Sequence, residues 1–372
     1  MPFTIIEPSI PAHPAAADAA EYLETVELGN LIDNEPFGTG HELDRLASEQ
    51  LPAWHDPYSP KRLFAARLDG RIVGQGVYET RADAGFRAGY AVVQVLPAGR
   101  RLGIGTALLE RIEAVARANG DTHLLAWTPV PPLDGEQLPS PTGFGAVPAS
   151  AAPVRFALAR GWRLEQVERV SRYPLPGDLE QLAERAAVAA EHSGDDYRVH
   201  HWTGATPTEW REQIAVLNTR MSTDAPSAGL EDPEDVWTAE RVVQKDRESA
   251  ASPRTMLTAA VEHRPTGALA GYSVLSVPAE LDRPVEQWNT LVLREHRGRR
   301  LGVLLKAANL LELQRIAAGR PSVITYNAEE NRPMLDVNEA LGFVPIGVEG
   351  AWRKDLGEPG AASARRERSP AR

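Results

Sequence analysis

The chain has 372 residues, of which 42% are hydrophobic, a formal net charge of −11 at pH 7 and no cysteine. This length and hydrophobic content suit two ordinary folded domains rather than one. Without cysteine the chain has no disulfide, no thiolate metal site and no cysteine nucleophile, and we expect no metal centre. The acidic balance argues against nucleic-acid binding, which needs a basic face.

Neither export nor membrane insertion is indicated. The first residues, MPFTIIE, contain no basic run and no long apolar run, so we expect no signal peptide. No stretch approaches the roughly 20 apolar residues that a membrane span requires. We therefore expect a cytoplasmic protein, monomeric or homodimeric, that acts neither at a membrane nor on nucleic acid.

The first half of the chain alternates strand and helix patterns. Residues 69–74 (DGRIVG) predict a hairpin turn leading into a strand, and residues 91–96 (AVVQVL) predict another strand. Residues 100–105 (RRLGIG) then open a helix over residues 105–119. The helix is expected to end at Gly120, because glycine is the usual residue just past a helix C-terminus.

A strand is predicted next, over residues 122–127, followed by a Pro/Gly-rich loop without periodicity over residues 129–148. The segment 158–162 (LARGW) leads into the last strand of this half, and residues 174–177 (PLPG) end it. A linking helix is expected over residues 178–192, with the aspartate at its start as N-cap.

The second half repeats these features in the same order. Residues 299–302 (RRLG) repeat residues 100–103 at an offset of 199 residues, and each copy follows an apolar run. Residues 266–271 (TGALAG) repeat the hairpin turn at an offset of 197. The second helix, over residues 304–318, also ends at a glycine. This order predicts duplication of one α/β unit rather than chance similarity.

The repeat predicts an α/β (α+β, mixed-sheet) protein of two tandem domains. The first domain is expected over residues 1–175, the linking helix over 176–196 and the second domain over 197–356. Residues 357–372 (GEPGAASARRERSPAR) are polar and basic and contain Pro, Gly and Ser, so we expect a disordered tail.

A strand, a tight glycine-containing loop and a helix start in this order form an anion site. The backbone N–H groups converge at the helix N-terminus, which carries partial positive charge, and glycine permits close approach of a pyrophosphate. Arg100 and Arg101 add positive charge in the first copy. Neither copy matches the Walker A or the GxGxxG dinucleotide pattern.

Residues 100–105 do fit [Q/R]xxGx[G/A], the coenzyme A signature of the GNAT superfamily of N-acetyltransferases, which the chain therefore resembles. Residues 299–304 (RRLGVL) match except at Leu304. The segment from Tyr326 to Phe343 is similar to the family's fifth strand and following helix. Two-domain members of the family, such as the mycothiol synthases, show the same plan.

The resemblance implies acetyl-CoA as the cofactor, bound through matching positions in both halves. In the first half these are Val93, Val95, Arg100, Arg101, Leu102, Gly103, Ile104, Gly105 and Thr106. In the second half they are Leu291, Leu293, Arg299, Arg300, Leu301, Gly302, Val303 and Leu304. Asn327, Asn331 and Asn338 match positions that line the pantetheine arm of the coenzyme.

The resemblance also implies direct attack of a small-molecule amine on the thioester, assisted by a general base. The family often places a glutamate 11 residues before the signature, but Gly89 and Trp288 occupy those positions here. Glu286, two residues before Trp288 and on the same face of a regular strand, is the base candidate. Asn338 takes the position of the family's tyrosine acid in the second half, and Ala157 takes it in the first.

These residues predict that the second domain is catalytic and that the first binds coenzyme structurally. The alternative is an acyl-CoA-binding sensor or scaffold without turnover. Residues 129–148 could instead dock a partner or a second copy. His296 is interpreted as an exposed loop histidine, with general acid–base catalysis or a phosphate contact as the alternative. Asp224 and residues 232–235 (DPED) are interpreted as a solvated acidic loop that could also attract a cationic amine.

Overall fold

The computed structural model describes residues 3–37, 43–82, 85–224, 226–230 and 233–357. The first half contains these elements in chain order: β1 (Thr4–Ile6), α1 (Ala20–Asn34), η1 (Glu35–Phe37), α2 (Ala47–Trp54), β2 (Lys61–Leu68), β3 (Arg71–Glu79), β4 (Ala88–Val95), η2 (Pro97–Gly99), α3 (Ile104–Asn119), β5 (His123–Val130), β6 (Gln137–Pro139), β7 (Ala146–Pro148), α4 (Ala152–Ala159) and β8 (Arg163–Pro174).

The helix α5 (Leu179–Ser193) leads into the second half. The second half contains β9 (Tyr197–Thr203), η3 (Thr208–Trp210), α6 (Arg211–Asp224), α7 (Ala239–Ala251), β10 (Thr255–His263), β11 (Ala268–Val277), β12 (Val285–Val292), η4 (Arg294–His296), α8 (Leu301–Ala317), β13 (Ser322–Ala328), α9 (Arg332–Leu341) and β14 (Val344–Asp355).

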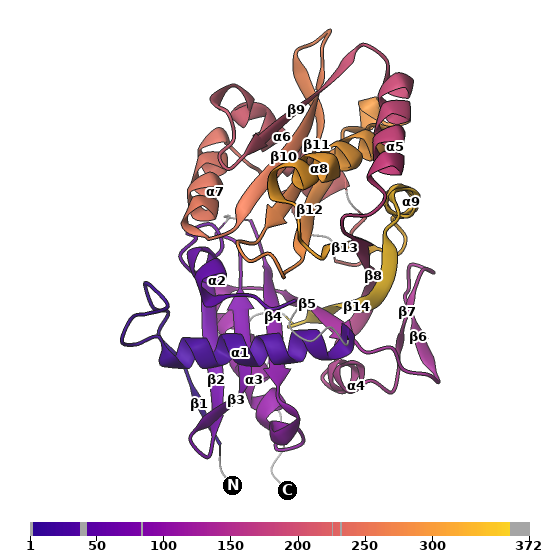
Figure 1. Cartoon of the computed structure of the whole chain (residues 1–372). Helices are drawn as coiled ribbons and strands as arrows, with labels where there is room; N and C mark the ends of the chain where they lie inside the picture. Colours follow the sequence, from indigo (N-terminus) through magenta and orange to yellow (C-terminus); the bar gives the residue numbers. More distant parts are fainter. Residues whose placement is uncertain (1–2, 38–42, 83–84, 225, 231–232, 358–372) are drawn as a thin grey trace, which may run out of the picture.

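One twelve-stranded sheet runs through both halves, in the order β1-β2-β3-β4-β5-β14-β8-β13-β12-β11-β10-β9. The last strand of each half pairs with the other half: β14 lies beside β5, and β8 lies beside β13. These two strands also pair with each other, side by side where the halves meet (Figure 1). Each half therefore contributes its last strand to the part of the sheet formed by the other half. Along the chain, the first half ends with β8 at Pro174 and the second begins with β9 at Tyr197. A division into two domains at these residues stays a prediction.

Helices cover both faces of the sheet in each half. In the first half, α1 packs Leu28 against Ala65, whereas α3 packs Leu108 against Ala66. Successive residues of a strand point to opposite faces, so α1 and α3 lie on opposite sides of the sheet. In the second half, α6 packs with Ala260 and α8 with Ala259 in the same way.

Two local predictions can be compared directly with the structure. The N-cap prediction for the linking helix is confirmed, because the carboxylate of Asp178 accepts a hydrogen bond from the backbone N–H of Gln181 at 2.9 Å. The prediction of a loop without regular structure over residues 129–148 is wrong, since β6 and β7 form a small antiparallel sheet there. Three-residue strands are too short to give a readable period. The predicted disordered tail lies outside the described residues, apart from residue 357.

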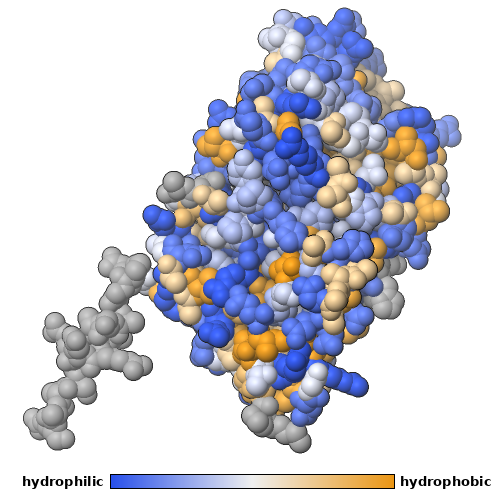
Figure 2. Space-filling view, turned by 90° about the vertical axis from the view of Figure 1, so that its left-hand side faces the viewer, coloured by the Kyte–Doolittle hydropathy of each residue, from blue (hydrophilic) through white to orange (hydrophobic). Residues whose placement is uncertain are grey.

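The surface is mixed in character. The face shown in Figure 2 is mostly hydrophilic, with hydrophobic atoms in separate patches rather than one continuous area. Within the described ranges, no helix is long and apolar enough to cross a membrane. Nor do three histidine, aspartate or glutamate side chains gather there as a metal site would require.

Candidate active site

Each half has a strand–loop–helix corner with the same backbone path. In the first half, Gly103 precedes α3 with a φ of 86°, and in the second, Arg300 precedes α8 with a φ of 57°. Two residues earlier, Arg101 and Gly298 also have positive φ values, of 67° and 80°. The two corners are therefore equivalent at an offset of 197 residues.

One arginine in each corner makes the same hydrogen bond to the backbone, which confirms this equivalence. Arg100 donates through Nε to the carbonyl oxygen five residues earlier at 3.1 Å, and Arg297 makes the same bond at 3.0 Å. Each also binds a carboxylate of its own half through Nη2: Glu35 at 3.1 Å for Arg100 and Asp224 at 2.8 Å for Arg297. Arg297, not Arg299, is the structural counterpart of Arg100.

The offset of 199 residues between the two RRLG copies is therefore wrong by two. The second loop runs from Arg297 to Gly302, so a glycine fills the last position of the signature, where the sequence comparison had placed Leu304. The departure from the signature is Arg300, which stands where the first loop has Gly103. A left-handed conformation costs a residue with a side chain about 1–2 kcal/mol. This strain places a guanidinium at the N-terminus of α8.

The first turns of α3 and α8 fit a phosphate-bearing ligand. Both helices begin with unpaired backbone N–H groups at a positive dipole end. A Cβ atom at Gly105 would lie 3.3 Å from Phe156, and one at Gly302 would lie 3.6 Å from Val337, so each glycine faces the helix that follows. The loop arginines Arg101, Arg299 and Arg300 are exposed.

The strands beside each corner diverge. The parallel ladder between β4 and β5 joins only Ala88–Tyr90 to His123–Leu125, although both strands continue. The ladder between β12 and β13 joins only Val285–Glu286 to Val323–Ile324. Beyond these pairs the facing backbone groups of the two strands do not bond to each other. An extended ligand with amide groups can bond to them instead.

Glu286 is the last residue of the β12–β13 ladder. Its side chain is 32% exposed, and Oε1 lies 3.4 Å from Nη2 of Arg254. Oε2 accepts a hydrogen bond from Nε1 of Trp288 at 3.1 Å. Once Arg297 is taken as the first signature residue, Glu286 lies 11 residues before it, at the position of the family's base.

The first half has no room for a carboxylate at the corresponding position. Counting 11 residues back from Arg100 gives Gly89. A Cβ atom there would lie 2.5 Å from the ring of Tyr78 and 2.8 Å from Leu124. Contacts below 3.0 Å require the neighbours to move, so the two halves differ in their capacity for base catalysis.

The structure brings Asn327 and Asn338 together, with Lys306 beside them. Nδ2 of Asn338 donates to Oδ1 of Asn327 at 2.7 Å, and Nζ of Lys306 donates to Oδ1 of Asn338 at 2.6 Å. Asn338 and Lys306 are each 1% exposed. Burial lowers the pKa of Lys306 to about 7. The amide of Asn338 has no ionisable proton, so by itself it cannot act as a general acid. Asn331 lies at the start of α9.

Carboxylates from both halves share the sheet face of Glu286. Glu168 of β8 and Glu349 of β14 are directly paired across the central strands. Burial, together with the carboxylates of Glu168 and Asp33, raises the pKa of Glu349 to about 8. Burial also raises the pKa of Glu168, whose Oε1 accepts a hydrogen bond from Nε1 of Trp127 at 2.6 Å.

Arg45 of the first half faces the same group. The negative charges of Glu286, Asp33 and Glu349 raise the pKa of Arg45, although its side chain remains exposed to solvent. Sequence reasoning missed these residues because the pairing of β8 with β14 brings them together across the two halves. No local pattern in the sequence signals that pairing.

Several other residues singled out from the sequence have structural partners. His296 interacts through Nδ1 with the hydroxyl of Tyr197 at 2.8 Å and is part-buried, so it is not the exposed loop histidine that was expected. Asp224 binds Arg294 and Arg297, so it is not a free acidic patch. Asp235 likewise binds Arg241. Residue 232 lies outside the described ranges.

The strand residues proposed to line the coenzyme are not equivalent in the two halves. Val93 and Val95 pack with the core beneath α3. Leu291 and Leu293 pack with α6, on the opposite face. At the offset of 197 residues, the counterparts of the two valines are Thr290 and Val292.

Comparisons with known proteins agree with this geometry. The profile of the Acetyltransferase (GNAT) family matches residues 28–134. A mycothiol acetyltransferase of Geodermatophilus obscurus is 26% identical over 305 residues, which cover 80% of this chain and 83% of that protein.

Solved structures share the fold over nearly the whole chain. A tandem GNAT protein from the clavulanic acid biosynthesis pathway is 24% identical with a TM-score of 0.69, covering 96% of this chain and 99% of its own. A GCN5-related N-acetyltransferase from Sphaerobacter thermophilus is 15% identical with a TM-score of 0.60, covering 95% and 96%. Residues 28–134 therefore match the Acetyltransferase (GNAT) family, and the chain as a whole shares the fold of a tandem GNAT protein.

Proposed function

We propose that this protein transfers an acetyl group from acetyl-CoA to the amine of a small molecule, and that the second half carries out the reaction. The observation that carries this proposal is the position of Glu286. It ends the β12–β13 ladder, 11 residues before Arg297, whereas the first half has Gly89 without space for a side chain.

The coenzyme would bind along the second corner. The N-terminus of α8, with Arg299 and Arg300 beside it, suits the phosphates. The diverging backbones of β12 and β13 suit the amide groups of the pantetheine arm, which would lead toward Asn327 and Asn338. Acetyl-CoA supplies the acetyl group as an activated thioester. The first corner has the same backbone path, so we propose that it binds a second coenzyme with a structural role.

Glu286 would accept a proton from the attacking amine, directly or through water. The amine nitrogen forms a bond to the carbonyl carbon, the carbon–sulfur bond breaks, and the leaving thiolate takes up a proton. A backbone N–H on β12 beyond Glu286 would stabilise the developing oxyanion. The ion pair with Arg254 and the hydrogen bond from Trp288 hold the carboxylate of Glu286 in place.

The charges around Glu286 support a cationic acceptor. Asp33 and Glu168 place carboxyl groups on this face, and Arg45 lies close to them. Glu349, whose pKa is raised to about 8, adds negative charge only as the pH rises toward that value. An amine that arrives protonated is attracted to such a face and can lose its proton to a carboxylate there. The name of the relative from Geodermatophilus obscurus also supports a small-molecule acceptor over a protein.

A matched pair of substitutions tests which half is catalytic. Gly105→Glu and Gly302→Glu place the same negative charge at equivalent positions of the two corners. We expect Gly302→Glu to abolish acetyl transfer, and Gly105→Glu to remove only the coenzyme bound to the first half. Coenzyme stoichiometry by calorimetry and thermal unfolding control for loss of folding. Loss of turnover with Gly105→Glu alone would assign the reaction to the first half.

One observation favours a second candidate function, an acyl-CoA sensor without turnover. Asn338 occupies the position where the family has its tyrosine acid. It is a buried amide that already forms hydrogen bonds with Asn327 and Lys306. Calorimetry with acetyl-CoA, followed by an assay of free thiol with a broad panel of amines, separates the two functions. Binding without thiol release for any amine would establish the sensor.

A further inference from the structure

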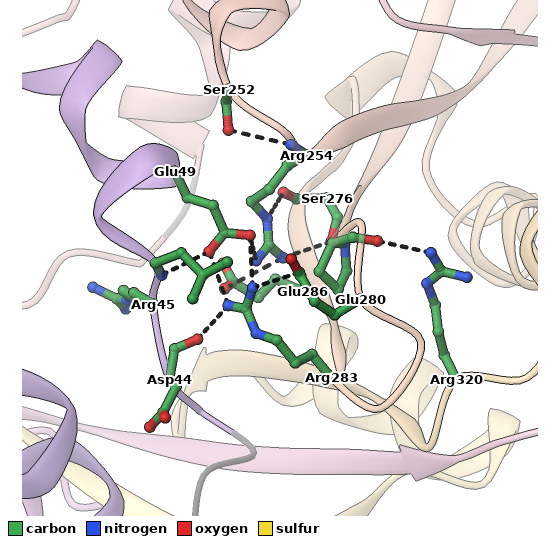
Figure 3. Close-up of polar contacts among 12 residues, drawn as sticks. Asp44, Arg45, Glu49, Ser252, Arg254, Ser276, Glu280, Arg283, Glu286 and Arg320 are labelled. Carbon is green, nitrogen blue, oxygen red and sulfur yellow. Dashed lines mark hydrogen bonds and ion pairs between the residues drawn. The ribbon is translucent and has the colours of Figure 1, made fainter. Parts of the chain in front are cut away.

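Glu49 of α2 connects the first half of the chain to the second. Its side chain is 4% exposed, and its two oxygens accept hydrogen bonds from Nη1 and Nη2 of Arg283, both at 2.8 Å. Oε2 also accepts from the backbone N–H of Leu46 at 3.1 Å, which orders the start of α2. Arg283 in turn donates to the backbone carbonyl of Asp44 (Figure 3).

Arg254 extends this contact to Glu286. Its Nη1 lies 3.4 Å from Oε1 of Glu49, and its Nη2 lies 3.4 Å from Oε1 of Glu286. Figure 3 shows the guanidinium of Arg254 between the two carboxylates. Ser276, which pairs with Glu286 across β11 and β12, accepts from Nε of Arg254 at its hydroxyl (2.7 Å) and from Nη2 at its carbonyl (2.8 Å).

The charges in this group depend on Glu49. Arg254 and Arg283 are 9% and 10% exposed, and both contact the carboxylate of Glu49. Arg283 also pairs with Glu280 at 3.1 Å, whereas the second carboxylate beside Arg254 is Glu286. A buried cation that loses its counterion must find another. For Arg254 the nearest alternative is Glu286, which Arg45 of the first half and Tyr326 of β13 also face. With Glu49 ionised, Arg254 stays at 3.4 Å from Glu286 and divides its charge between the two carboxylates.

We propose that Glu49 is a positioning residue for Glu286 and acts through Arg254, so that the first half of the chain sets the basicity of the reaction site in the second. This inference rests on the proposed role of Glu286. It explains why the two halves share contacts at α2, which lies in neither corner. Neither half then has the complete site by itself.

The first test compares pH profiles of turnover. Glu49→Gln removes the charge at nearly constant volume, and Glu49→Asp retains it. We expect Glu49→Gln to lower kcat about tenfold and to move the acidic limb of kcat/KM about one pH unit lower, because Arg254 turns its full charge to Glu286. The KM for acetyl-CoA should stay unchanged. In Glu49→Asp, which keeps the negative charge, the acidic limb should lie close to its wild-type pH.

The matched control is Glu113→Gln. Glu113 of α3 forms another ion pair between the halves, with Lys354 of β14, and both side chains are comparably buried at 12% and 16% exposed. It shares no partner with Glu49 or Arg254. We expect this variant to lose stability with an unchanged pH profile. An unchanged profile in Glu49→Gln, or an equal shift in Glu113→Gln, would overturn the proposal.

A second measurement does not depend on turnover. Trp288 donates its indole N–H to Glu286, so its environment reports the ionisation of that carboxylate. The chain has 8 tryptophans, so in protein labelled with 5-fluorotryptophan the Trp288→Phe variant assigns the fluorine resonance. We expect its titration midpoint to move about one pH unit lower in Glu49→Gln and not in Glu113→Gln. If wild-type protein transfers no acetyl group but the midpoint moves, the proposed function fails while the positioning stands; a midpoint that does not move contradicts the positioning.

Discussion

Arg300 occupies in the second half the backbone position that Gly103 occupies in the first. Both residues precede the central helix of their half in the left-handed conformation, with φ values of 57° and 86°. The arginine is strained there and the glycine is not. The chain therefore keeps a charged residue at a strained position directly before α8, where the proposed coenzyme phosphates would lie.

Arg300→Gly tests the role of this strained arginine. Strain relief and the added chain entropy of glycine act in opposite directions, so we expect the free energy of unfolding to change by less than about 1 kcal/mol. Affinity for acetyl-CoA should fall about tenfold, and its dependence on salt should weaken, because a phosphate contact is lost. Calorimetry at two ionic strengths measures both effects. Unchanged affinity would show that the guanidinium does not contact the coenzyme.

Gly89→Ala tests whether the first half lacks room for a side chain at the position that Glu286 occupies in the second half. The added Cβ would lie 2.5 Å from Tyr78 and 2.8 Å from Leu124, so we expect a loss of about 2 kcal/mol in the free energy of unfolding. Gly302→Ala is the control, because its nearest contact would be an ordinary 3.6 Å. Urea unfolding measures both variants. Equal stability of the two would mean that the first half does have room at Gly89.

Lys306→Met tests the buried lysine. In the folded protein burial lowers the pKa of Lys306 to about 7 from 10.5, so the folded state binds fewer protons than the unfolded state between these values. Stability from this group therefore rises with pH across that window. We expect the unfolding free energy of the wild type, minus that of Lys306→Met, to rise by up to about 1.4 kcal/mol per pH unit. Urea unfolding at pH 7.5, 8.5 and 9.5, conditions chosen within roughly this window, measures the difference. A constant difference would show that Lys306 is charged when folded.

Glu349→Gln should show the opposite dependence on pH. The folded pKa of Glu349 is raised to about 8 from 4.5, so the folded state binds more protons than the unfolded state between these values. The stability that this group contributes is present below the unfolded pKa and is lost as the pH rises through 8. We expect the wild type to lose stability relative to Glu349→Gln over this range, by up to about 1.4 kcal/mol per pH unit. Parallel stability curves would contradict the raised pKa.

The sequence predicts the local parts of the site well. The apolar runs, the glycines after the helices and the N-cap at Asp178 all reflect contacts within a few residues, and the structure reproduces them. The family signature at residues 100–105 likewise lies in one continuous segment. Such features depend on local backbone preferences, which a sequence displays directly.

The register of the second loop was harder to predict. The identical residues RRLG favoured an offset of 199 residues. Residues with the same backbone conformation in the two loops are instead 197 residues apart. Gly298 and Arg300 take the left-handed positions, and a sequence comparison does not expect arginine at one of them. The offset of 197 between the hairpin turns at residues 69–74 and 266–271 already carried the correct register.

The exchange of β8 and β14 could not be read from the sequence. The two strands are far apart along the chain, yet they pair directly with each other. Their pairing places Glu168 next to Glu349 and completes the acidic face. The contact between Glu49 and Arg283, 234 residues apart, is equally non-local. Long-range pairing of this kind follows from the packing of the whole molecule and not from any segment.

The central claim is that Glu286 of the second half is the general base, and the pH profile of Glu286→Gln tests it most directly. The substitution keeps the size of the side chain and removes its ability to accept a proton. We predict that kcat falls about 100- to 1,000-fold and that the acidic limb of kcat/KM disappears, while acetyl-CoA still binds. Turnover close to that of the wild type, with the acidic limb intact, would contradict the assignment.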